Sequence, residues 1–484
     1  MRVLFAVAEV TPFSKAGGLA DVAGALPAEL ARMGLKMVVI SPLYSLVRER
    51  GTGLNFAGIS GTVLMGKRSY GYKVHRVSTV EEVTLDYLFV QNSEFYDRPG
   101  IYAQPDGTGF ADSNARFFFF QRVLVDLIGK GDLDPEIVHL NDHHTALLPL
   151  LLANRGIRAR TLLTVHNFEY QGSFSPKELS LLEERDRSQI RRLYPRRPGE
   201  SYNALEIGLR QAHRVNTVSP SHASELLKTE GHSFGLFNVL TSIKSRFSGI
   251  LNGADYSIWN PSLDPYLDIR YDVDSLDGKT RNKSKLLKEC GLPDRLDDPL
   301  MGSVSRLVES KGFHLVLGIA EKLIQWDIRM VFLGTGDEII KERLEALANR
   351  YPGHVAFHHG FDEDLAHQIE AGADMFMMPS EFEPCGLNQI YSLRYGTIPI
   401  VHETGGLADT VDNWNGSKGN GFVFKRYTER AFLRAVGKAI KAYRQPSVWR
   451  RIMRNAMKED FSWFRAAMHY RELYSVLLSE EGDS

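Results

Sequence analysis

VLFAVAEVTPFSKAGGLADVAGAL, residues 3–26, is the stretch that decides the fold. An apolar run leads through a polar turn and two glycines into a helical pattern, which Pro27 is expected to interrupt. Glycines at such a junction let backbone N–H groups approach a ligand, and a helix N-terminus supplies partial positive charge for phosphate. The pentapeptide GGLAD returns at residues 405–409, again after a strand-like run. We therefore expect two similar halves, each with a glycine-rich ligand loop.

Short runs of Val, Ile and Leu alternate with helical patterns along most of the chain. The first series lies at 3–8, 36–41, 86–91, 137–140, 160–166 and 214–219, and the second lies at 299–307, 329–334, 354–360, 374–379 and 397–402. Such runs are typical of parallel sheets that are buried on both faces. The pattern predicts an α/β fold of two Rossmann-like, doubly wound domains. We expect them at 1–252 with the C-terminal helix 460–484, and at 253–459.

The C-terminal helix is expected to pack on the first domain. Its predicted apolar face contains Phe461, Phe464, Met468 and Leu477.

Composition excludes several classes of function. The chain has 484 residues, 43% of them hydrophobic, and a net charge of -1, so neither nucleic acid nor a membrane surface is an expected partner. Its two cysteines, Cys290 and Cys385, are not spaced for a zinc site or a disulfide framework. The opening residues are unlike a signal peptide. We expect a soluble cytoplasmic protein.

A metal site is not expected at the adjacent histidines His143 and His144. Neighbouring side chains on an extended segment point in opposite directions, which separates the two rings.

PSEFEPCGLNQIYSLRYGTIPIV, residues 379–401, is the richest stretch in chemistry. It follows an apolar run, so Glu383 and Cys385 are expected on a loop at the carboxyl edge of a sheet, where α/β proteins bind ligands. Gly386 and Leu387 would then open a helix whose free amides can hold a diphosphate. Alternatively, Glu383 is an ordinary acid near a helix N-terminus, and Cys385 is a buried filler.

Arg306 and Lys311 lie between a strand-like run and a helical one. Two cations on such a loop suit a nucleotide diphosphate leaving group, although two solvated surface charges are the simpler interpretation of this pair alone. A dehydrogenase is disfavoured, because neither GGLAD nor GTGD at 334–337 completes a G-x-G-x-x-G pattern.

Taken together, these segments resemble the family of bacterial glycogen synthases and plant starch synthases, which are retaining glucosyltransferases of the GT-B fold. The resemblance runs nearly end to end. It includes Lys15 with GGLADV, TVHNFEYQG, GILNGADYSIWNP, VSRLVESKG, LGTGD, SEFEPCGLNQ and TGGLADTV.

The resemblance implies a role for each of several residues. Those expected at the sugar donor in the first domain are Lys15, Gly17, Gly18 and Asp21, with Asp142 on the glucose or acceptor side and His166 against the transferred glucose. Arg306 and Lys311 would neutralise the diphosphate, while Glu383 and the segment Cys385, Gly386, Leu387 would bind glucose and phosphate.

The sequence departs from the family pattern at three places. Ala16 replaces a threonine, the stretch NDHH at 141–144 replaces histidine-aspartate-tryptophan-histidine, and Glu381 replaces an arginine. His143 and Glu381 could alter contacts to the acceptor or to the nucleotide.

The resemblance implies transfer of glucose from ADP-glucose to the non-reducing end of an α-1,4-glucan such as glycogen, with retention and without a metal or other cofactor. The reaction is expected in a deep cleft between the two domains, with hinges near Gly253 and Asp460. Two alternatives remain open. One is a UDP-glucose-dependent or maltose-1-phosphate-forming relative, and the other is a catalytically silent glucan-binding scaffold.

Overall fold

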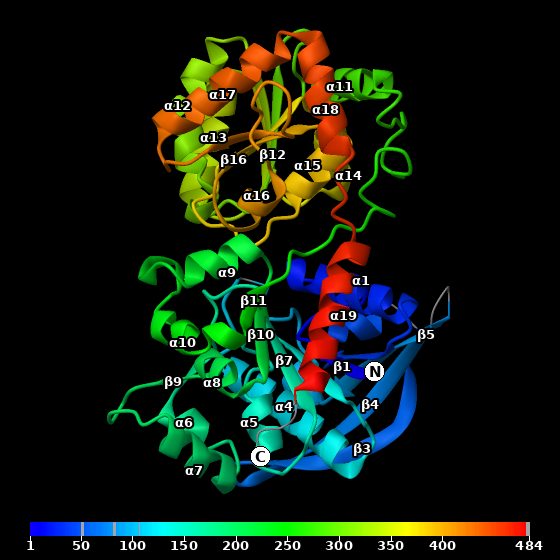
Figure 1. Cartoon of the computed structure of the whole chain (residues 1–484), viewed down its shortest axis with the longest axis vertical. Helices are drawn as coiled ribbons and strands as arrows, with labels where there is room; N and C mark the ends of the chain where they lie inside the picture. The colour runs from blue at the N-terminus through cyan, green and yellow to red at the C-terminus, as the bar shows by residue number, and fades with distance from the viewer. Residues whose placement is uncertain (50–52, 81–83, 106, 481–484) are drawn as a thin grey trace. The chain divides into compact units, whose positions relative to one another are not determined.

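The computed structural model describes residues 1–49, 53–80, 84–105 and 107–480. Its contacts divide the chain into two compact units (Figure 1). Unit 1 consists of Met1–Val218, Ala223–Ile250 and Trp463–Ser484, and unit 2 consists of Ser219–His222 and Leu251–Ser462. Each unit is built on a largely parallel sheet flanked by helices, so the predicted α/β class is confirmed.

Unit 1 contains a nine-stranded sheet of order β11-β10-β7-β6-β1-β2-β5-β4-β3. All its pairs are parallel except β3–β4 and β4–β5. Its strands are β1 (Arg2–Ala6), β2 (Lys36–Pro42), β3 (Asn55–Met65), β4 (Arg68–Val80), β5 (Thr84–Gln91), β6 (Ile137–Asn141), β7 (Arg160–Val165), β10 (Arg214–Thr217) and β11 (Phe247–Gly249). A separate antiparallel pair is formed by β8 (Ser173–Phe174) and β9 (Tyr202–Asn203).

The helices of unit 1 follow these strands, apart from the last, which comes from the end of the chain, and residues 220–222 at the start of one helix belong to unit 2. They are α1 (Gly18–Arg32), α2 (Ser45–Glu49), α3 (Ser93–Tyr96), α4 (Ser113–Lys130), α5 (Leu148–Ala153), α6 (Pro176–Leu179), α7 (Glu184–Leu193), α8 (Ala204–Gln211), α9 (Pro220–Leu226), α10 (Phe237–Ser242) and α19 (Trp463–Ser479). Contrary to the prediction, α1 continues through Pro27, which is buried. A proline inside a helix removes one backbone hydrogen bond, and packing of this buried face offsets that loss.

Unit 2 contains a six-stranded, fully parallel sheet of order β14-β13-β12-β15-β16-β17. Its strands are β12 (Leu300–Val304), β13 (Arg329–Gly334), β14 (Val355–His359), β15 (Met375–Met378), β16 (Ile398–His402) and β17 (Phe422–Phe424). Its helices are α11 (Asp277–Glu289), α12 (Phe313–Ile324), α13 (Glu338–Arg350), α14 (Glu363–Gly372), α15 (Asn388–Tyr395), α16 (Gly405–Thr410), α17 (Glu429–Tyr443) and α18 (Pro446–Met457).

The two faces of this sheet are filled by alternate residues of each strand. On β13, Met330 and Phe332 join the cluster that contains α12, α17 and α18, while Val331 and Leu333 join the cluster that contains α11 and α14. Side chains of a strand alternate between faces, so a continuous apolar run is what a sheet covered on both sides requires.

The C-terminal helix α19 packs on α1 within unit 1, where Figure 1 shows the red helix beside the blue one. Its buried residues are Trp463, Ala466, Ala467, Tyr470, Tyr474 and Leu477, which follow helical spacing. Three members of the predicted face are therefore wrong. Phe464 is 52% exposed and Met468 is 46% exposed, because both lie on the neighbouring stripe of the helix. Phe461 lies before the helix begins and packs against buried residues of unit 2.

A buried polar chain fixes this helix to the sheet. His139 contacts the Tyr474 hydroxyl through Nδ1 and the Thr164 hydroxyl through Nε2, both at 2.6 Å. Because Thr164 donates its proton to Asn216 Oδ1, it accepts from Nε2 of His139, and Nδ1 accepts from Tyr474.

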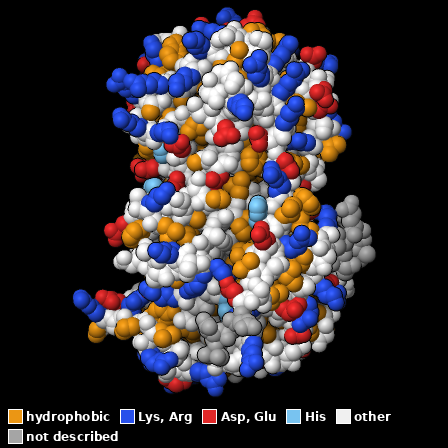
Figure 2. All heavy atoms as spheres, in the orientation of Figure 1, with side chains coloured by type: hydrophobic (Ala, Val, Ile, Leu, Met, Phe, Trp, Pro, Cys, Tyr) orange, Lys and Arg blue, Asp and Glu red, His pale blue; other side chains and the backbone are white. Residues whose placement is uncertain are grey.

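The surface is mixed in charge. Acidic and basic side chains are interspersed over the face that Figure 2 displays. Among the described residues, no helix is both long and apolar enough to cross a bilayer.

Removing the Tyr474 hydroxyl should weaken unit 1. Tyr474→Phe leaves the buried Nδ1 of His139 without its donor, and such a loss costs about 1–3 kcal/mol. We expect faster hydrogen exchange at the amides of β6, measured by mass spectrometry. Ser475→Ala, which removes an exposed hydroxyl from the same helix, is the control, and equal exchange in both variants would contradict the argument.

Candidate active site

The predicted residues of unit 1 gather where the strand order of its sheet reverses. Its parallel strands run outward in both directions from β1 and β6, which are neighbours. Lys15 and Asp21 follow β1, Asp142 follows β6, and His166 follows β7. Ligands of doubly wound sheets bind at the carboxyl ends of strands at such a switch point. The topology therefore makes this edge the candidate site of unit 1.

Glu9, which sequence reasoning missed, holds the first glycine loop. Its Oε2 accepts from the amides of Ala16 and Gly17, the latter at 3.0 Å, and its Oε1 accepts from the Tyr102 hydroxyl at 3.0 Å. Those two amides are thus bound to a carboxylate, rather than free for a phosphate as the glycine pattern suggested. Burial raises the pKa of Glu9 above its ordinary value. The sequence signal for Glu9 is an acid directly after a buried strand.

The loop keeps one open side. Lys15 Nζ lies 2.8 Å from Asp21 Oδ1, and both side chains are partly exposed. A Cβ on Gly18 would meet no described atom within 4 Å, so packing within the protein does not require this glycine. Open space beside a helix N-terminus is compatible with a close ligand.

Asp142 and His166 form the second part of the unit 1 site. Asp142 Oδ1 accepts from the His166 amide at 2.7 Å, and Asp142 has a φ of 56°, in the left-handed region. Burial raises the pKa of Asp142 to about 7 and lowers that of His166 to about 3. His166 is therefore a neutral imidazole at physiological pH.

The tautomer of His166 follows from its partner. Asn141 donates to the carbonyl of Ala6 through Nδ2, so its Oδ1 accepts from His166 Nε2 at 2.9 Å. Nδ1 of His166 is then the nitrogen that can accept a hydrogen bond from a hydroxyl group.

The predicted separation of the two rings of His143 and His144 is wrong, although this does not contradict the expectation that they form no metal site. The ring centroids of His143 and His144 are 3.8 Å apart, because this segment forms a turn rather than an extended strand. Burial lowers the pKa of both rings. Over the ranges that the structure describes, no group of three or more His, Cys, Asp or Glu side chains is placed to hold a metal ion.

The predicted residues of unit 2 also gather at a switch point, between β12 and β15. A pocket of about 170 Å³ there is lined by Arg306 and Lys311 after β12, and by Glu383, Gly386 and Leu387 after β15. Five of the residues predicted from the sequence thus share one cavity. Ser380 and Asn388 also line it.

Glu383 is the only carboxylate among the residues that line this pocket. It is 6% exposed, and its Oε2 lies 2.5 Å from Lys311 Nζ and 3.1 Å from the Ser380 hydroxyl. Arg306 is exposed and forms no ion pair with any residue that the structure describes. The pocket therefore offers one paired and one unpaired cation.

Cys385 lies behind the pocket rather than in it. Its side chain is buried, and burial raises the pKa of the thiol to about 12. A thiol with this pKa is protonated at neutral pH and is a poor nucleophile. Gly386 has a φ of 71°, a backbone conformation that favours glycine.

The second GGLAD motif supports this loop directly. A Cβ on Gly405 would lie 2.0 Å from the Glu383 carbonyl oxygen, and one on Gly406 would lie 2.0 Å from the Cys385 carbonyl oxygen. The amide of Gly406 donates to the Glu383 carbonyl at 3.1 Å. These glycines let α16 approach the loop, and they do not face open space as Gly18 does.

Comparisons with known proteins agree with this architecture. The model of the starch synthase catalytic domain matches residues 2–242, and the model of glycosyl transferases group 1 matches residues 291–458. The solved catalytic domain of Starch Synthase IV from Arabidopsis thaliana, bound to ADP and acarbose, is 32% identical, with a TM-score of 0.87 and coverage of 99% of both chains. Fold and site together define a glycosyltransferase of the GT-B class.

Curated relatives narrow this class. Glycogen synthase of Lactobacillus acidophilus is 39% identical over 99% of this chain and 100% of that protein. Glycogen synthase of Thermotoga maritima is 39% identical over the full length of both. The chain belongs to the family of glycogen and starch synthases, and it is a glucosyltransferase.

The raised pKa of Asp142 predicts a pH-dependent stability. The folded state keeps the proton up to about pH 7, whereas the unfolded chain releases it near the ordinary value of 3.8, so rising pH between these values destabilises the folded state. Asp142→Asn should abolish this loss, and the melting temperature of the wild type should fall relative to the variant between pH 5 and pH 8. The exposed Asp132→Asn is the control, and parallel curves for Asp142→Asn and the wild type would refute the assignment.

Proposed function

We propose that this enzyme transfers glucose from ADP-glucose to the non-reducing end of an α-1,4-glucan such as glycogen, with retention at the anomeric carbon. We place the reaction in the cytoplasm, without a metal or other cofactor. The observation that carries the proposal is the unit 2 pocket that joins Arg306, Lys311 and Glu383 at a switch point. The names of the relatives and the ADP and acarbose of the solved structure support the donor and the acceptor.

The two cations serve the leaving group. When the glycosidic bond to the diphosphate breaks, negative charge develops on ADP, and preorganised positive groups stabilise it. Arg306 brings a guanidinium with no described acidic partner, suited to a phosphate. Lys311 brings an ammonium group that Glu383 orients at 2.5 Å.

Retention proceeds without a covalent glucosyl intermediate. A glycosidase-type double displacement uses two carboxyl groups about 5 Å apart. The unit 2 pocket has one, and Glu383 is already engaged by Lys311 and Ser380. We propose that ADP departs from the same face that the acceptor hydroxyl approaches, through an ion-pair-like state.

The unit 1 residues bind the transferred sugar in this proposal. Glucose is uncharged, so neutral hydrogen-bonding groups suit its hydroxyls. His166 is neutral and offers Nδ1, and Asp142, whose pKa is about 7, can donate or accept. Lys15, oriented by Asp21, adds a positive charge on the donor side.

Phe361 is our candidate for the nucleotide base, and sequence reasoning missed it. It follows β14 and is 81% exposed. Two strand spacings separate β14 from β12, which Arg306 follows, and this is about 10 Å, within the length of a nucleoside diphosphate. An aromatic ring there can stack on adenine or uracil alike, so it supports a nucleotide without selecting one.

Donor preference is tested by transfer of radiolabelled glucose from ADP-glucose and from UDP-glucose to glycogen and maltooligosaccharides. Preference for ADP-glucose supports the proposal. Preference for UDP-glucose would overturn the choice of donor and retain the fold. Absence of transfer from both would favour a silent glucan-binding scaffold.

Loss of the Lys311 charge should slow catalysis. Lys311→Gln is expected to lower kcat for glucose transfer by about 10²–10³-fold, because the departing diphosphate loses a preorganised cation. Lys322→Gln, which removes an exposed lysine from α12, should leave kcat unchanged. A Lys311→Gln enzyme with the kcat of the wild type would refute the role of this residue.

Removal of the exposed ring should affect donor binding. Phe361→Ala is expected to raise KM for the sugar nucleotide by about tenfold, since base stacking on an aromatic ring contributes about 1–3 kcal/mol, and to change kcat little. Steady-state kinetics with varied donor measure both values. Ile339→Ala removes another exposed apolar side chain, 68% exposed at the start of α13, and serves as the control. A fall in kcat with an unchanged KM would contradict stacking.

A further inference from the structure

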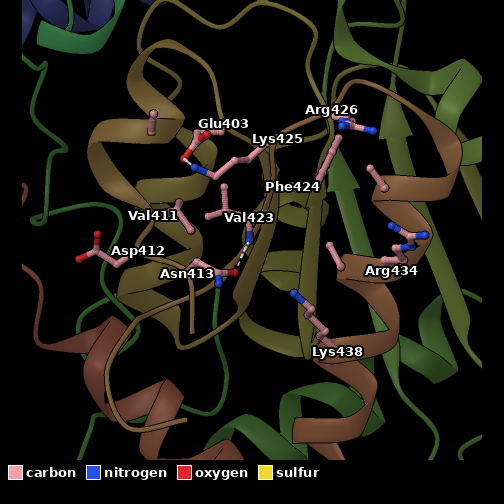
Figure 3. Close-up of a pocket in the computed structure, with 13 residues that line it drawn as sticks. Glu403, Val411, Asp412, Asn413, Val423, Phe424, Lys425, Arg426, Arg434 and Lys438 are labelled. Carbon is pink, nitrogen blue, oxygen red and sulfur yellow. Dashed lines mark hydrogen bonds and ion pairs between the residues drawn. The ribbon is translucent and has the colours of Figure 1, made fainter. Parts of the chain in front are cut away.

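A second pocket in unit 2 lies at the opposite end of the sheet order from β14. It measures about 460 Å³ and is formed by the edge strand β17, the helix α17 and the segment that contains α16 (Figure 3). It shares no lining residue with the pocket of Arg306 and Glu383. Neither the expected donor nor the expected acceptor accounts for it.

Positive charge dominates this second pocket. Four cations line it, Lys425, Arg426, Arg434 and Lys438, against the two carboxylates Glu403 and Asp412. Lys425 Nζ pairs with Glu403 Oε1 at 3.2 Å. Arg426, Arg434 and Lys438 form no ion pair with any residue in the described part of the chain.

The spacing of two of these cations is unfavourable without an anion. Arg434 and Lys438 are four residues apart on α17, so they lie on the same helical face. Like charges at this spacing destabilise a helix. Figure 3 shows Arg426, Arg434 and Lys438 along one side of the pocket, and Glu403 with Lys425 along the other. A bound anion would relieve the repulsion.

The base of the pocket is apolar. Val411, Val423, Ala431 and Ala435 line it beneath the charged rim. The backbone there is fixed, since Asn413 Oδ1 accepts from the Val423 amide at 3.0 Å (Figure 3). A volume of about 460 Å³ falls within the range of small-molecule sites and exceeds what orthophosphate alone fills. A ligand that matches this lining and volume would combine an anionic group with an organic body.

We propose that this pocket binds a small phosphate ester, such as a sugar phosphate. Its phosphate lies among Arg426, Arg434 and Lys438, because arginine and lysine are the side chains that bind phosphate oxygens best. Its uncharged body lies over the apolar base. A neutral glucan has no use for three unpaired cations, which separates this site from one for the acceptor.

Helix α16 connects the second pocket to the loop that carries Glu383. Ala408 and Val411, at the end of this helix, line the second pocket. At its beginning, Gly405 and Gly406 pack against the carbonyls of Glu383 and Cys385. An occupant that shifts α16 therefore changes the loop that carries Glu383, and it alters KM for the sugar donor. This consequence rests on the proposed function, whereas binding itself does not.

Isothermal titration calorimetry with ribose 5-phosphate, orthophosphate and ribose tests the site. We expect ribose 5-phosphate to bind most tightly and ribose not to bind. Arg434→Gln with Lys438→Gln should weaken ribose 5-phosphate by at least about tenfold, since two charge-assisted contacts are lost. The matched double variant Arg430→Gln with Lys441→Gln removes the same charge from exposed positions of α17 outside the pocket, and it should bind as the wild type does.

The donor pocket is the competing site for phosphate. Arg306→Gln with Lys311→Gln should retain the binding of ribose 5-phosphate. The proposal would be overturned if this variant lost binding while the double variant Arg434→Gln, Lys438→Gln retained it. Absence of binding to the wild type would also overturn it. Steady-state kinetics with varied donor then test whether binding acts through α16. If the wild-type enzyme binds ribose 5-phosphate and KM for the sugar donor does not change, the coupling through α16 is refuted and the binding site is retained.

Discussion

Both units are organised by the reversal of strand order in a parallel sheet. In unit 1 the reversal lies between β1 and β6, and in unit 2 it lies between β12 and β15. The loops that leave the carboxyl ends of two such strands diverge to opposite faces of the sheet, which leaves a crevice that backbone amides and short polar side chains can line. Every residue predicted for the chemistry follows a strand at or next to one of these two positions. The strand order of each sheet thus determines where the candidate residues lie, and the side chains determine only what they can bind there.

The repeated GGLAD pentapeptide serves two different physical needs. At Gly18 a side chain would meet open space, so the glycine leaves room beside the N-terminus of α1. At Gly405 and Gly406 a side chain would collide with the carbonyls of the donor loop, so the glycines are required by the packing of α16. The two aspartates also differ in their partners. Asp21 pairs with Lys15, whereas Asp409 accepts from the hydroxyls of Ser219 and Ser221, both at 2.6 Å. The same sequence motif at two strand-to-helix junctions therefore does not imply that both copies contact a ligand in the same way.

Much of the fold could be predicted from the sequence, because strands buried on both faces read as continuous apolar runs. The antiparallel hairpin β3–β4 was not predicted, since β3 is not a continuous buried run: its residues 55–62 are exposed or partly buried, and they include Phe56, which is 53% exposed. The grouping of Arg306, Lys311 and Glu383 was implied by the family resemblance, and their places after strands agree with it. Glu9, Asn141 and Phe361 did not, because their roles depend on contacts or exposure set by distant parts of the chain. The faces of α19 were misassigned for the same reason, since Phe464 and Trp463 are equally apolar and only the tertiary packing distinguishes them.

Burial divides the chemistry between the two units. In unit 1 it drives the two buried candidate groups toward their neutral forms, so His166 is an uncharged imidazole and Asp142 retains a proton up to about pH 7, while the partly exposed Lys15 and Asp21 form an ion pair. Neutral donors and acceptors recognise hydroxyl groups without the desolvation cost that a full charge would carry. In unit 2 the opposite holds, because Lys311 lies against a carboxylate and Arg306 remains open to solvent, an environment that suits ions. The proposed donor has an uncharged sugar part and a charged diphosphate part. Buried neutral groups suit the first and cations suit the second, so each set of residues lies in an environment that matches its charge state.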